Sequence, residues 1–433
     1  MNPNRLQVGI DFSQKRADFC LLFGNGQPLI AHQAFANSRL GYQQARQVLL
    51  ESLHAFPFDG LDVSGEATSY YWFPFFWQMA HDAELGAWDL SLFLLNPRQV
   101  HWFKKSLPPN DKTDSTDPFY IAERTRTRRP KATWEPQDEW LPLRFYTRLR
   151  FHLARALTSE KNYYLVHLFL LHNTYRRNQP FSDPFGVTSQ KVLGSEQSLV
   201  ELVNLPVEEL AERLDAWSGG KLDDPLETAH KLQQVAQDSF PLDEPLLTPV
   251  QNILDLTQEH IRFLEKQIAQ AEGWIAAEVQ CHHPEVLFLA TVPGVGLVLA
   301  AGIAAEIGNL GRFFQTPKWD KKRKRYRTKT LREVEDAVAK LAGLWWPRSE
   351  SGDFVAEDRH LAKTGNRYLR YYFVQAANGM RRYIPAYTQF YNLKFREATQ
   401  HKHKRALVLS ARKSIGLFVG LLHRKEAYRP QEA

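Results

Sequence analysis

The chain has 433 residues, of which 43% are hydrophobic and 24% charged, and a formal net charge of +7. This length predicts two or three domains, and the composition excludes a chain that is disordered or fibrous throughout. The pI near 9.2 favours an anionic partner, although such a balance alone does not identify nucleic acid as that partner.

The cysteines and the apolar runs bear on the cellular compartment. Cys20 and Cys281 form neither a CxxC pair nor a zinc-ligand pattern, which indicates a reducing cytoplasm. The first residues, MNPNRLQVGIDF, lack the segments of a signal peptide. No apolar run reaches the ~20 residues that would span a bilayer. We therefore expect a cytoplasmic protein without a membrane partner.

The first 140 residues predict an α/β domain. Residues 7–12, 17–23 and 27–35 have the pattern of three strands joined by short turns. A helix at 40–53, a strand at 60–64, an aromatic helix after Ala67 and a strand at 90–95 follow. Three antiparallel strands and then alternating helices and strands are the order of a ribonuclease H-like (RuvC-like) fold, although the alternation also fits other α/β folds.

The rest of the chain predicts an all-α arrangement. Residues 141–175 have apolar residues at helical spacing, with arginines on the remaining faces. Pro and Gly divide residues 178–241 into the short helices of a small module. Residues 246–279 have near-heptad apolar spacing, typical of a long helix that acts as an interdomain strut or a dimerisation element. We expect a catalytic domain at 1–140, a helical and coiled-coil linker at 141–285, a C-terminal domain at 286–425 and a loose tail at 426–433.

Four acidic residues fall where the elements of the first domain begin or end. Asp11 lies at the end of the first predicted strand and Glu66 just beyond the fourth, while Asp114 and Asp117 share one face at the start of a helix. The first and fourth strands are neighbours in a ribonuclease H-like sheet, so this fold can bring the acids together. Four carboxylates in one place repel one another unless a cation neutralises them, and hard oxygen ligands suit Mg²⁺ or Mn²⁺. Two such ions can stabilise both the attacking and the leaving oxygen of a phosphodiester.

Each acid taken singly also has a structural interpretation. Asp117, which precedes Pro118, could cap a helix, and Asp11 could be a turn residue at a strand end. The combination of all four favours the metal site.

Two segments of the C-terminal part can bind phosphate. Residues 290–308 predict a small-residue helix after a turn with Gly294 and Gly296, which can present backbone N–H groups to DNA as helix-hairpin-helix elements do. A turn that packs two helices closely is the alternative. Residues 318–332 hold nine basic residues and one acid, with Trp319 and Tyr326 between them. This pattern favours a surface that follows phosphates and stacks on bases, against the alternative of a solvated charge run.

Two serines follow in AGLWWPRSESGDF. Ser349 and Ser351 lie in a predicted turn, and Gly352 gives Ser351 the backbone freedom that a nucleophile near phosphorus needs. No GxSxG pattern and no His with an Asp is placed to activate either serine. A structural turn serine is therefore the alternative.

These pieces, in this order, resemble the insertion-sequence-110 family of transposases, which are similar to the Piv DNA invertase. The matching residues are VGIDFSQKRADFCLL, SGEATSYYW, LLNPRQVHWFKKSLPPNDKTDSTDPFYIAER, the arginine-bearing helix after Leu141, SDPFG with LVNLPVEELAERL, LATVPGVGLVLAAGIAAEIGNLGRF, AGLWWPRSESG and LAKTGNRYLRYYF. The resemblance spans most of the chain. The segment from Gln315 to Lys340 is longer and more basic than the corresponding link in the family.

The resemblance implies a RuvC-like DEDD domain followed by a mostly helical transposase domain that supplies a serine nucleophile. By motif, the acids are Asp11, Glu66, Asp114 and Asp117, and the nucleophile is Ser351, with Ser349 as the alternative. The implied reaction is Mg²⁺-dependent (or Mn²⁺-dependent) cleavage and exchange of DNA strands through a phosphoserine intermediate.

The resemblance also implies a structured bridge RNA that pairs with donor and target DNA, so that the protein reads shape and backbone while base pairing reads sequence. Strand exchange between two duplexes leads us to expect a homodimer or homotetramer. The residues that we expect to contact nucleic acid are Arg124, Arg126, Arg128, Arg129, Lys131, Arg144, Arg148, Gly294, Gly296, Lys321, Lys322, Arg323, Lys324, Arg325, Lys363, Asn366 and Arg367.

Three other functions compete with a recombinase. A RuvC-like junction resolvase or nuclease would use water in place of the serine. An actin-like ATPase or sugar kinase would share VGIDFS, but the sequence has no second phosphate loop and no adenosine-binding glycine motif downstream. A non-catalytic RNA-binding scaffold would not need the four acids, which cost a basic protein affinity for nucleic acid unless a metal occupies them.

Overall fold

The chain folds into two compact units, Met1–Asp138 and Glu139–Ala433. The computed structural model describes residues 4–106, 116–130, 133–136, 138–193, 203–315, 318–320, 323–347, 350–351, 354–355, 361–362 and 364–430. Each unit is described by itself below.

The first unit contains a five-stranded mixed sheet in the order β3-β2-β1-β4-β5. The three strands of the N-terminal meander pair antiparallel, while β1 with β4 and β4 with β5 pair parallel. The prediction that the first and fourth strands are neighbours is therefore confirmed. The strands are β1 (Arg5–Phe12), β2 (Arg16–Leu22), β3 (Pro28–Ala36), β4 (Gly60–Glu66) and β5 (Ser91–Leu95).

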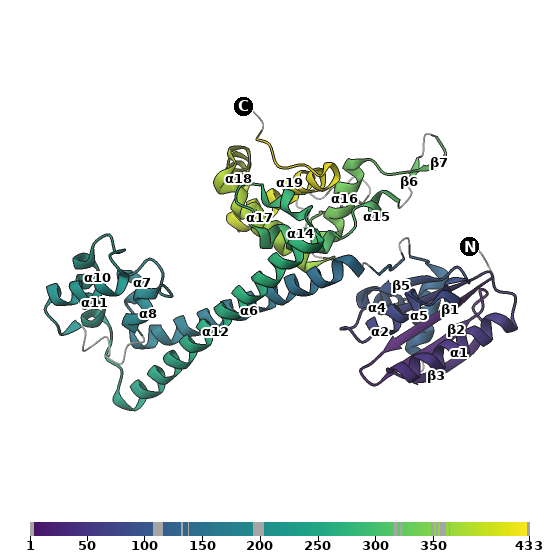
Figure 1. The fold of residues 1–433 in the computed structure, drawn as a ribbon, viewed down its shortest axis with the longest axis horizontal. Coiled ribbons are helices and arrows are strands. Elements are labelled where there is room, and N and C mark those ends of the chain that lie inside the picture. The colour runs from purple at the N-terminus through teal and green to yellow at the C-terminus, as the bar shows by residue number, and fades with distance from the viewer. Residues whose placement is uncertain are drawn as a thin grey trace. The chain divides into compact units, whose positions relative to one another are not determined.

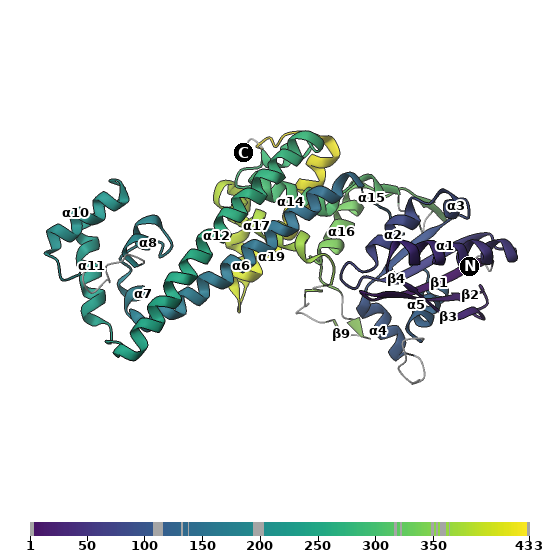
Figure 2. The same ribbon diagram turned by 60° about the horizontal axis from the view of Figure 1, so that its bottom comes forward.

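Helices cover both faces of this sheet because its strands bury side chains on both sides. Alternate residues of β1, among them Val8 and Ile10, form one core with α1 (Arg39–Ala55) and α2 (Phe73–Ala80). On the other face, Cys20 and Leu22 of β2 contact α5 (Thr116–Thr127), and Phe93 and Leu95 of β5 contact α4 (Pro97–Lys105) and α5. A short helix α3 (Ala83–Gly86) follows α2. Figure 2 shows α1 and α2 on one side of the sheet and α4 and α5 on the other.

Helix α5 lies directly on the backbone of β1. A Cβ atom added to Gly9 would come within 2.0 Å of the Pro118 carbonyl oxygen and 2.5 Å of the Ala122 nitrogen. The buried Ser64 hydroxyl of β4 donates to Thr125 Oγ1 at 2.6 Å and adds a second connection between the sheet and this helix. The first turn of α5 is thereby held at the end of β1.

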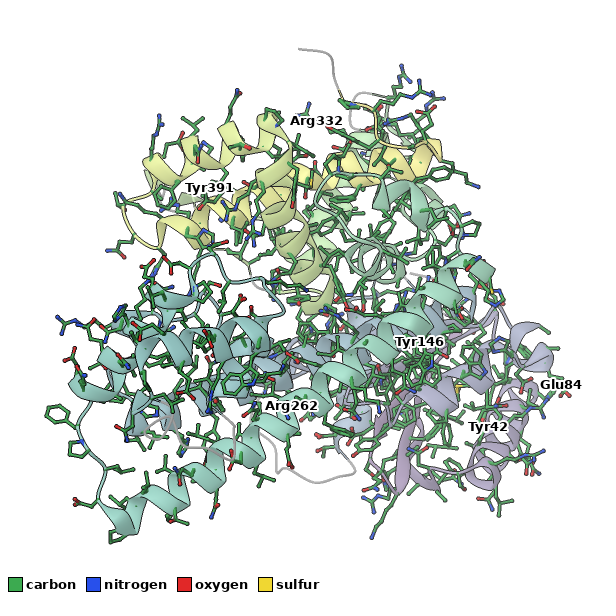
Figure 3. All side chains as sticks on the ribbon, turned by 60° about the vertical axis from the view of Figure 1, so that its left-hand side comes forward. Tyr42, Glu84, Tyr146, Arg262, Arg332 and Tyr391 are labelled. Carbon is green, nitrogen blue, oxygen red and sulfur yellow. The ribbon has the colours of Figure 1, made fainter. Side chains whose placement is uncertain are left out.

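In the second unit, two long helices run side by side and antiparallel (Figure 1). These are α6 (Leu141–Leu171), preceded by the 3₁₀ turn η1 (Asp138–Trp140), and α12 (Glu244–His282). Arg150 of α6 pairs with Glu272 of α12 at 2.9 Å, and the Tyr146 ring, labelled in Figure 3, packs against Trp274 at 5.8 Å between centroids. The two predicted long helices are confirmed, although α6 ends at Leu171, a few residues before the predicted end.

At one end of this helix pair, short helices form a small module, as the Pro and Gly pattern predicts. Its core contains Tyr164 and Leu168 of α6 together with Leu210 and Leu232. The helices are α7 (Tyr175–Asn178), α8 (Val187–Leu193), α10 (Val207–Ser218) and α11 (Pro225–Asp238), and Figure 1 shows α7, α8, α10 and α11 gathered at that end.

The remainder of the second unit packs around α14 (Leu297–Ile307). This helix is built largely of small residues, so Gly302 allows the Tyr372 ring to lie where a Cβ would be, at 2.5 Å. In the expected tail, Tyr428 packs against this core and its backbone N–H donates to Thr291 Oγ1 at 2.8 Å. The other elements are α13 (Val286–Ala290), α15 (Gly311–Gln315), β6 (Lys318–Asp320), β7 (Arg325–Arg327), α16 (Leu331–Ala342), β8 (Glu350–Ser351), β9 (Phe354–Val355), α17 (Arg367–Tyr383), α18 (Pro385–Glu397) and α19 (Lys402–Arg424).

Two segments of this unit are long and apolar enough to cross a membrane by length and composition, Leu297–Gln315 and Lys402–Arg424. This differs from the sequence prediction that no apolar run reaches that length. Half of the apolar stretch in each is buried, and α14 and α19 contribute side chains to the same core. Because core helices of ordinary globular proteins pass the same test, these segments are weak evidence for a membrane span.

The approach of α5 to β1 predicts that Gly9→Ala destabilises the first unit. The added methyl group meets backbone atoms, so α5 must shift outward, at a cost of about 1–3 kcal/mol in the free energy of unfolding. Urea denaturation measures this cost. The matched control is Gly86→Ala at the end of α3, where nothing lies within 4 Å of an added Cβ, and we expect that change to be neutral or slightly stabilising. Equal stability of the Gly9 variant and the native chain would contradict the close packing.

Candidate active site

Two of the predicted acids lie at the same edge of the sheet. Asp11 is the penultimate residue of β1, and Glu66 is the last residue of β4. The two strands are parallel neighbours with Ile10 opposite Gly65. Asp11 and Glu66 are the next residues of the two strands, so they lie side by side. The register of this pair therefore brings the two carboxylates together, as the strand order predicts.

Asp117 joins them from the first turn of α5. Its Oδ1 accepts an ion-pair contact from Lys104 Nζ of α4 at 2.8 Å, and both side chains are only about one-quarter exposed (27% and 26%). Helix α4 begins directly after β5, where the Asn96 side chain accepts from the Arg98 N–H and caps the helix. An ammonium group from α4 thus reaches the acidic cluster.

The protonation behaviour of Glu66 reports how close these charges are. Burial is the largest cause of a raised pKa for its carboxyl, and the negative charges of Asp11 and Asp117 raise this pKa further. The positive charge of Lys104 opposes them and is the second largest influence. Three carboxylates and one ammonium group therefore interact at one place, with an excess of negative charge.

The fourth predicted acid, Asp114, lies outside the residues that the structure describes. Within the described part of the chain, no three His, Cys, Asp or Glu side chains are close enough together to hold one metal ion. The donors that do converge are carboxylate oxygens, which are hard ligands suited to Mg²⁺ or Mn²⁺. Their mutual repulsion, partly offset by Lys104, is what a bound cation would relieve, so the chemistry of these donors suits a divalent metal, although the described carboxylates alone do not form a site for one.

The predicted nucleophile lies in the second unit. Ser351 ends strand β8 and is paired with Phe354 of β9 in a short antiparallel ladder, where the sequence predicts a turn. Ser349 lies outside the described residues.

Basic residues near the end of α5 make contacts within the first unit. Arg126 forms a two-pronged ion pair with Glu123, at 2.6 Å for both nitrogens. Arg129 contacts Asp62 at 3.1 Å and lies over the Phe93 ring, and Arg124 donates to the Arg128 carbonyl. Arg128 is exposed. Lys131 lies outside the described residues.

Arg144 and Arg148, predicted to bind nucleic acid, are used by the C-terminal fold. The Arg148 guanidinium binds both carboxylate oxygens of the buried Glu306, at 2.7 and 2.9 Å. Arg144 donates to the Ala305 carbonyl at 2.8 and 3.0 Å. Asn366, which caps α17, donates its amide to Glu306 at 2.5 Å. These contacts connect α6, α14 and α17, and they give the three predicted residues a structural role.

The two glycines of the predicted phosphate-binding turn differ in their surroundings. A Cβ on Gly294 would meet the Gly379 backbone at 2.5 Å, so this glycine allows the turn to pack against α17. Gly296 precedes α14 and has open space around its α-carbon. Gly294 therefore has the alternative role, close packing between two helices, while the backbone of Gly296 stays accessible to solvent.

The other predicted contact residues are mostly exposed. Arg323, Lys324 and Arg325 are exposed around β7. Arg367 begins α17 with its guanidinium over the Tyr368 ring. Lys321, Lys322 and Lys363 lie outside the described residues.

Sequence reasoning missed two residues of importance. Lys104 lies in the last turn of α4, where a lysine is commonplace and gives no signal of a functional role. Glu306 stands in a run of small apolar residues, and that isolated charge was the available signal for a buried partner.

Comparison with known proteins bears on both units. A family model of DEDD transposases matches residues 8–172, and a model described as Transposase IS116/IS110/IS902 family matches residues 328–392. The chain belongs to the insertion-sequence-110 family of transposases. The first match contains the acidic cluster of this transposase family member, and the second contains α16 and Ser351.

A curated relative of this transposase family member is the pilin gene-inverting protein of Moraxella bovis. It is 25% identical over 160 residues, which are 36% of this chain. The chain spans a little less than half of the length of that relative, 46%.

The raised pKa of Glu66 predicts that Glu66→Gln stabilises the metal-free protein at neutral pH. The folded chain binds the proton of the Glu66 carboxyl more tightly than the unfolded chain does. Ionisation of this carboxyl therefore destabilises the fold as the pH rises above 4.5, the ordinary pKa of a glutamate side chain. Thermal unfolding with a chelator present should give a higher Tm for the variant at pH 7.5. The difference should shrink as the pH falls towards 4.5.

The control for this measurement is Glu51→Gln, because Glu51 is an exposed residue of α1 whose carboxylate accepts from Gln47 at 2.9 Å. We expect that variant to have the same Tm as the native chain at every pH. A Glu66 variant that is less stable than the native chain at pH 7.5 would contradict the raised pKa of Glu66.

Proposed function

We propose that this chain cuts and rejoins DNA strands as the recombinase of a mobile element, with Asp11, Glu66, Asp114 and Asp117 as cation ligands and Ser351 as nucleophile. The observation that carries the proposal is the convergence of Asp11, Glu66 and Asp117 at the ends of β1 and β4 and the first turn of α5, where burial and then the charges of Asp11 and Asp117 raise the pKa of Glu66. The strand order and directions support a ribonuclease H-like, RuvC-like fold for this unit.

The four acids would hold Mg²⁺ or Mn²⁺. A divalent cation bound there would stabilise negative charge on the phosphodiester oxygens. The chain's own contribution is to hold the carboxylates of Asp11, Glu66 and Asp117 on strand and helix ends, so that they lose little mobility when they bind. Lys104, in contact with Asp117, would offset part of the negative charge and lower the electrostatic cost of bringing a phosphate to the site.

The covalent step that we propose exchanges one phosphate ester for another. The Ser351 hydroxyl oxygen attacks the phosphorus, a bond between Oγ and phosphorus forms, and the bond between phosphorus and one sugar oxygen breaks. The serine proton is transferred through the site or solvent to the departing sugar oxygen, which leaves as a hydroxyl. The reverse reaction with a different strand rejoins DNA without ATP, because the number of phosphodiester bonds is conserved.

The partners that we propose are donor and target DNA, a structured bridge RNA, and further copies of the chain in a homodimer or homotetramer. The exposed Arg128, Arg323, Lys324 and Arg325 support a nucleic-acid partner by their charge. The printed name of the bacterial relative, a gene-inverting protein, supports DNA rearrangement as the activity. We place this reaction in the cytoplasm.

The test is a covalent adduct between the chain and DNA. We expect mass spectrometry of the full chain, incubated with Mg²⁺, its flanking noncoding RNA and donor DNA, to find a nucleotide on Ser351. Ser351→Ala should lose this adduct and reduce strand exchange by several orders of magnitude, because removal of a nucleophile abolishes the covalent route. Asp11→Asn should lose cleavage and adduct together.

The matched control is Ser349→Ala, which should keep both the adduct and the exchange. An adduct that persists in Ser351→Ala but disappears in Ser349→Ala would identify Ser349 as the nucleophile. Cleavage that persists in Ser351→Ala without any adduct would contradict the recombinase mechanism and leave a metal-dependent nuclease that uses water.

A further inference from the structure

Strands β6 and β7 form a two-stranded hairpin whose side chains alternate between two faces. Trp319 is directly opposite Tyr326 in the register, so both rings lie on one face. Lys318 is opposite Arg327 and therefore lies on the other face. Figure 1 shows β6 and β7 extending away from the helical body of the second unit. An isolated hairpin of this kind is marginally stable unless something holds it.

The face with Lys318 and Arg327 is held by α16. Glu333 accepts from Lys318 Nζ at 2.7 Å and from both terminal nitrogens of Arg327 at 2.8 Å. It also accepts from the Thr330 N–H at 2.9 Å, in the capping box that begins α16. The hydrogen bonds from Arg327 and then Lys318 lower the pKa of Glu333, so this carboxylate stays charged. The hairpin is thus fixed to α16 through one face.

The opposite face presents two aromatic rings to solvent. Trp319 is 47% exposed and Tyr326 is 68% exposed. Their centroids are 5.1 Å apart in an edge-to-face arrangement. Neither ring is among the described residues that form the core clusters of this unit. Two large rings that no core requires, held outward by an ion-paired anchor, form a surface for a flat apolar partner.

Basic residues lie between the two rings in the chain. Arg323, Lys324 and Arg325 are exposed, and the register places Arg325, opposite Asp320, on the face of Lys318 and Arg327. Aromatic rings bordered by cations are the arrangement that binds single-stranded nucleic acid, because unpaired bases stack on the rings while phosphates contact the cations. Bases in a duplex are already stacked on one another, so the rings favour an unpaired strand.

The position of the hairpin in the chain connects it with the cleavage step. In the chain, the hairpin comes before α16, and strand β8, which contains Ser351, comes after α16. One helix of the second unit therefore separates the hairpin from the serine. In the sequence, β6 and β7 also fall between the two segments that match family models, 8–172 and 328–392.

We propose that the Trp319–Tyr326 face stacks on unpaired bases of the DNA strand beside the cleavage point. The proposal rests on the proposed function for the location of that strand. During strand exchange the cut strand must leave its original complement, and the ring pair supplies the stacking that it loses. The surface therefore holds the strand between cleavage and rejoining.

The experiment measures the affinity of the full chain, in a chelator that prevents cleavage, for fluorescent single-stranded DNA, single-stranded RNA and duplex DNA of one sequence. The variant Trp319→Thr/Tyr326→Thr removes both rings but keeps residues that favour strands. We expect its affinity for single-stranded DNA to fall by roughly 5- to 150-fold for each stacked base. Its affinity for the duplex should stay unchanged.

Two further variants separate stacking from folding. Trp319→Phe/Tyr326→Phe retains both rings and should retain binding to single-stranded DNA. Phe240→Thr/Tyr163→Thr replaces two other exposed rings of the same unit, 80% and 50% exposed, and should bind as the native chain does.

Unchanged affinity of the Thr variant for single-stranded DNA, or an equal loss for the duplex, would overturn the proposal. A loss confined to RNA would overturn the assignment to DNA. Because the assay needs no chemistry, Ser351→Ala should bind like the native chain, and a failure of the serine mechanism would leave this result unaffected.

Discussion

The parallel pairing of β1 with β4 is the constraint on which the candidate active site depends. The register that places Ile10 opposite Gly65 also fixes Asp11 and Glu66 at one edge of the sheet. Gly9, which has no side chain, lets α5 lie on the same strand and brings Asp117 to that edge. The backbone therefore buries Glu66 and brings like charges near it, and both effects, burial first, raise the pKa of this carboxyl. A fold that accepts this repulsion is suited to binding a cation, with Lys104 as a partial counter-charge.

The second unit has its own central charge. Glu306 is buried between α6, α14 and α17, and its carboxylate is satisfied by Arg148 and Asn366. A buried carboxylate without these partners would be strongly destabilising, so the three helices are specified relative to one another. In the chain, α16 of this unit is preceded by the β6–β7 hairpin and followed by β8, which contains Ser351. Both features that we propose for DNA handling thus flank one helix of this unit in the chain.

The sequence predicts the elements better than it predicts the partners of individual side chains. Strong apolar alternation in β1 and β2 and helical spacing in α6 and α12 reveal these elements, because burial imposes a period on the sequence. The strand order then places Asp11 and Glu66 side by side. An arginine on a helix has no such signature, so Arg144 and Arg148 look alike whether they meet phosphate or a buried carboxylate. Gly294 is ambiguous for the same reason, since its contact with Gly379 involves residues far apart in the chain. Lys104 was missed because its role depends on Asp117, which belongs to another helix.

The most direct test of this account is a titration of the full chain with Mn²⁺ in the absence of DNA, in which electron paramagnetic resonance measures the binding. The account predicts saturable binding by the native chain, strongly weakened in Asp11→Asn and in Asp117→Asn and unaffected in Asp59→Asn, an exposed acid of the same unit. Binding that is equal in all four proteins would contradict the claim that these carboxylates form one cation site.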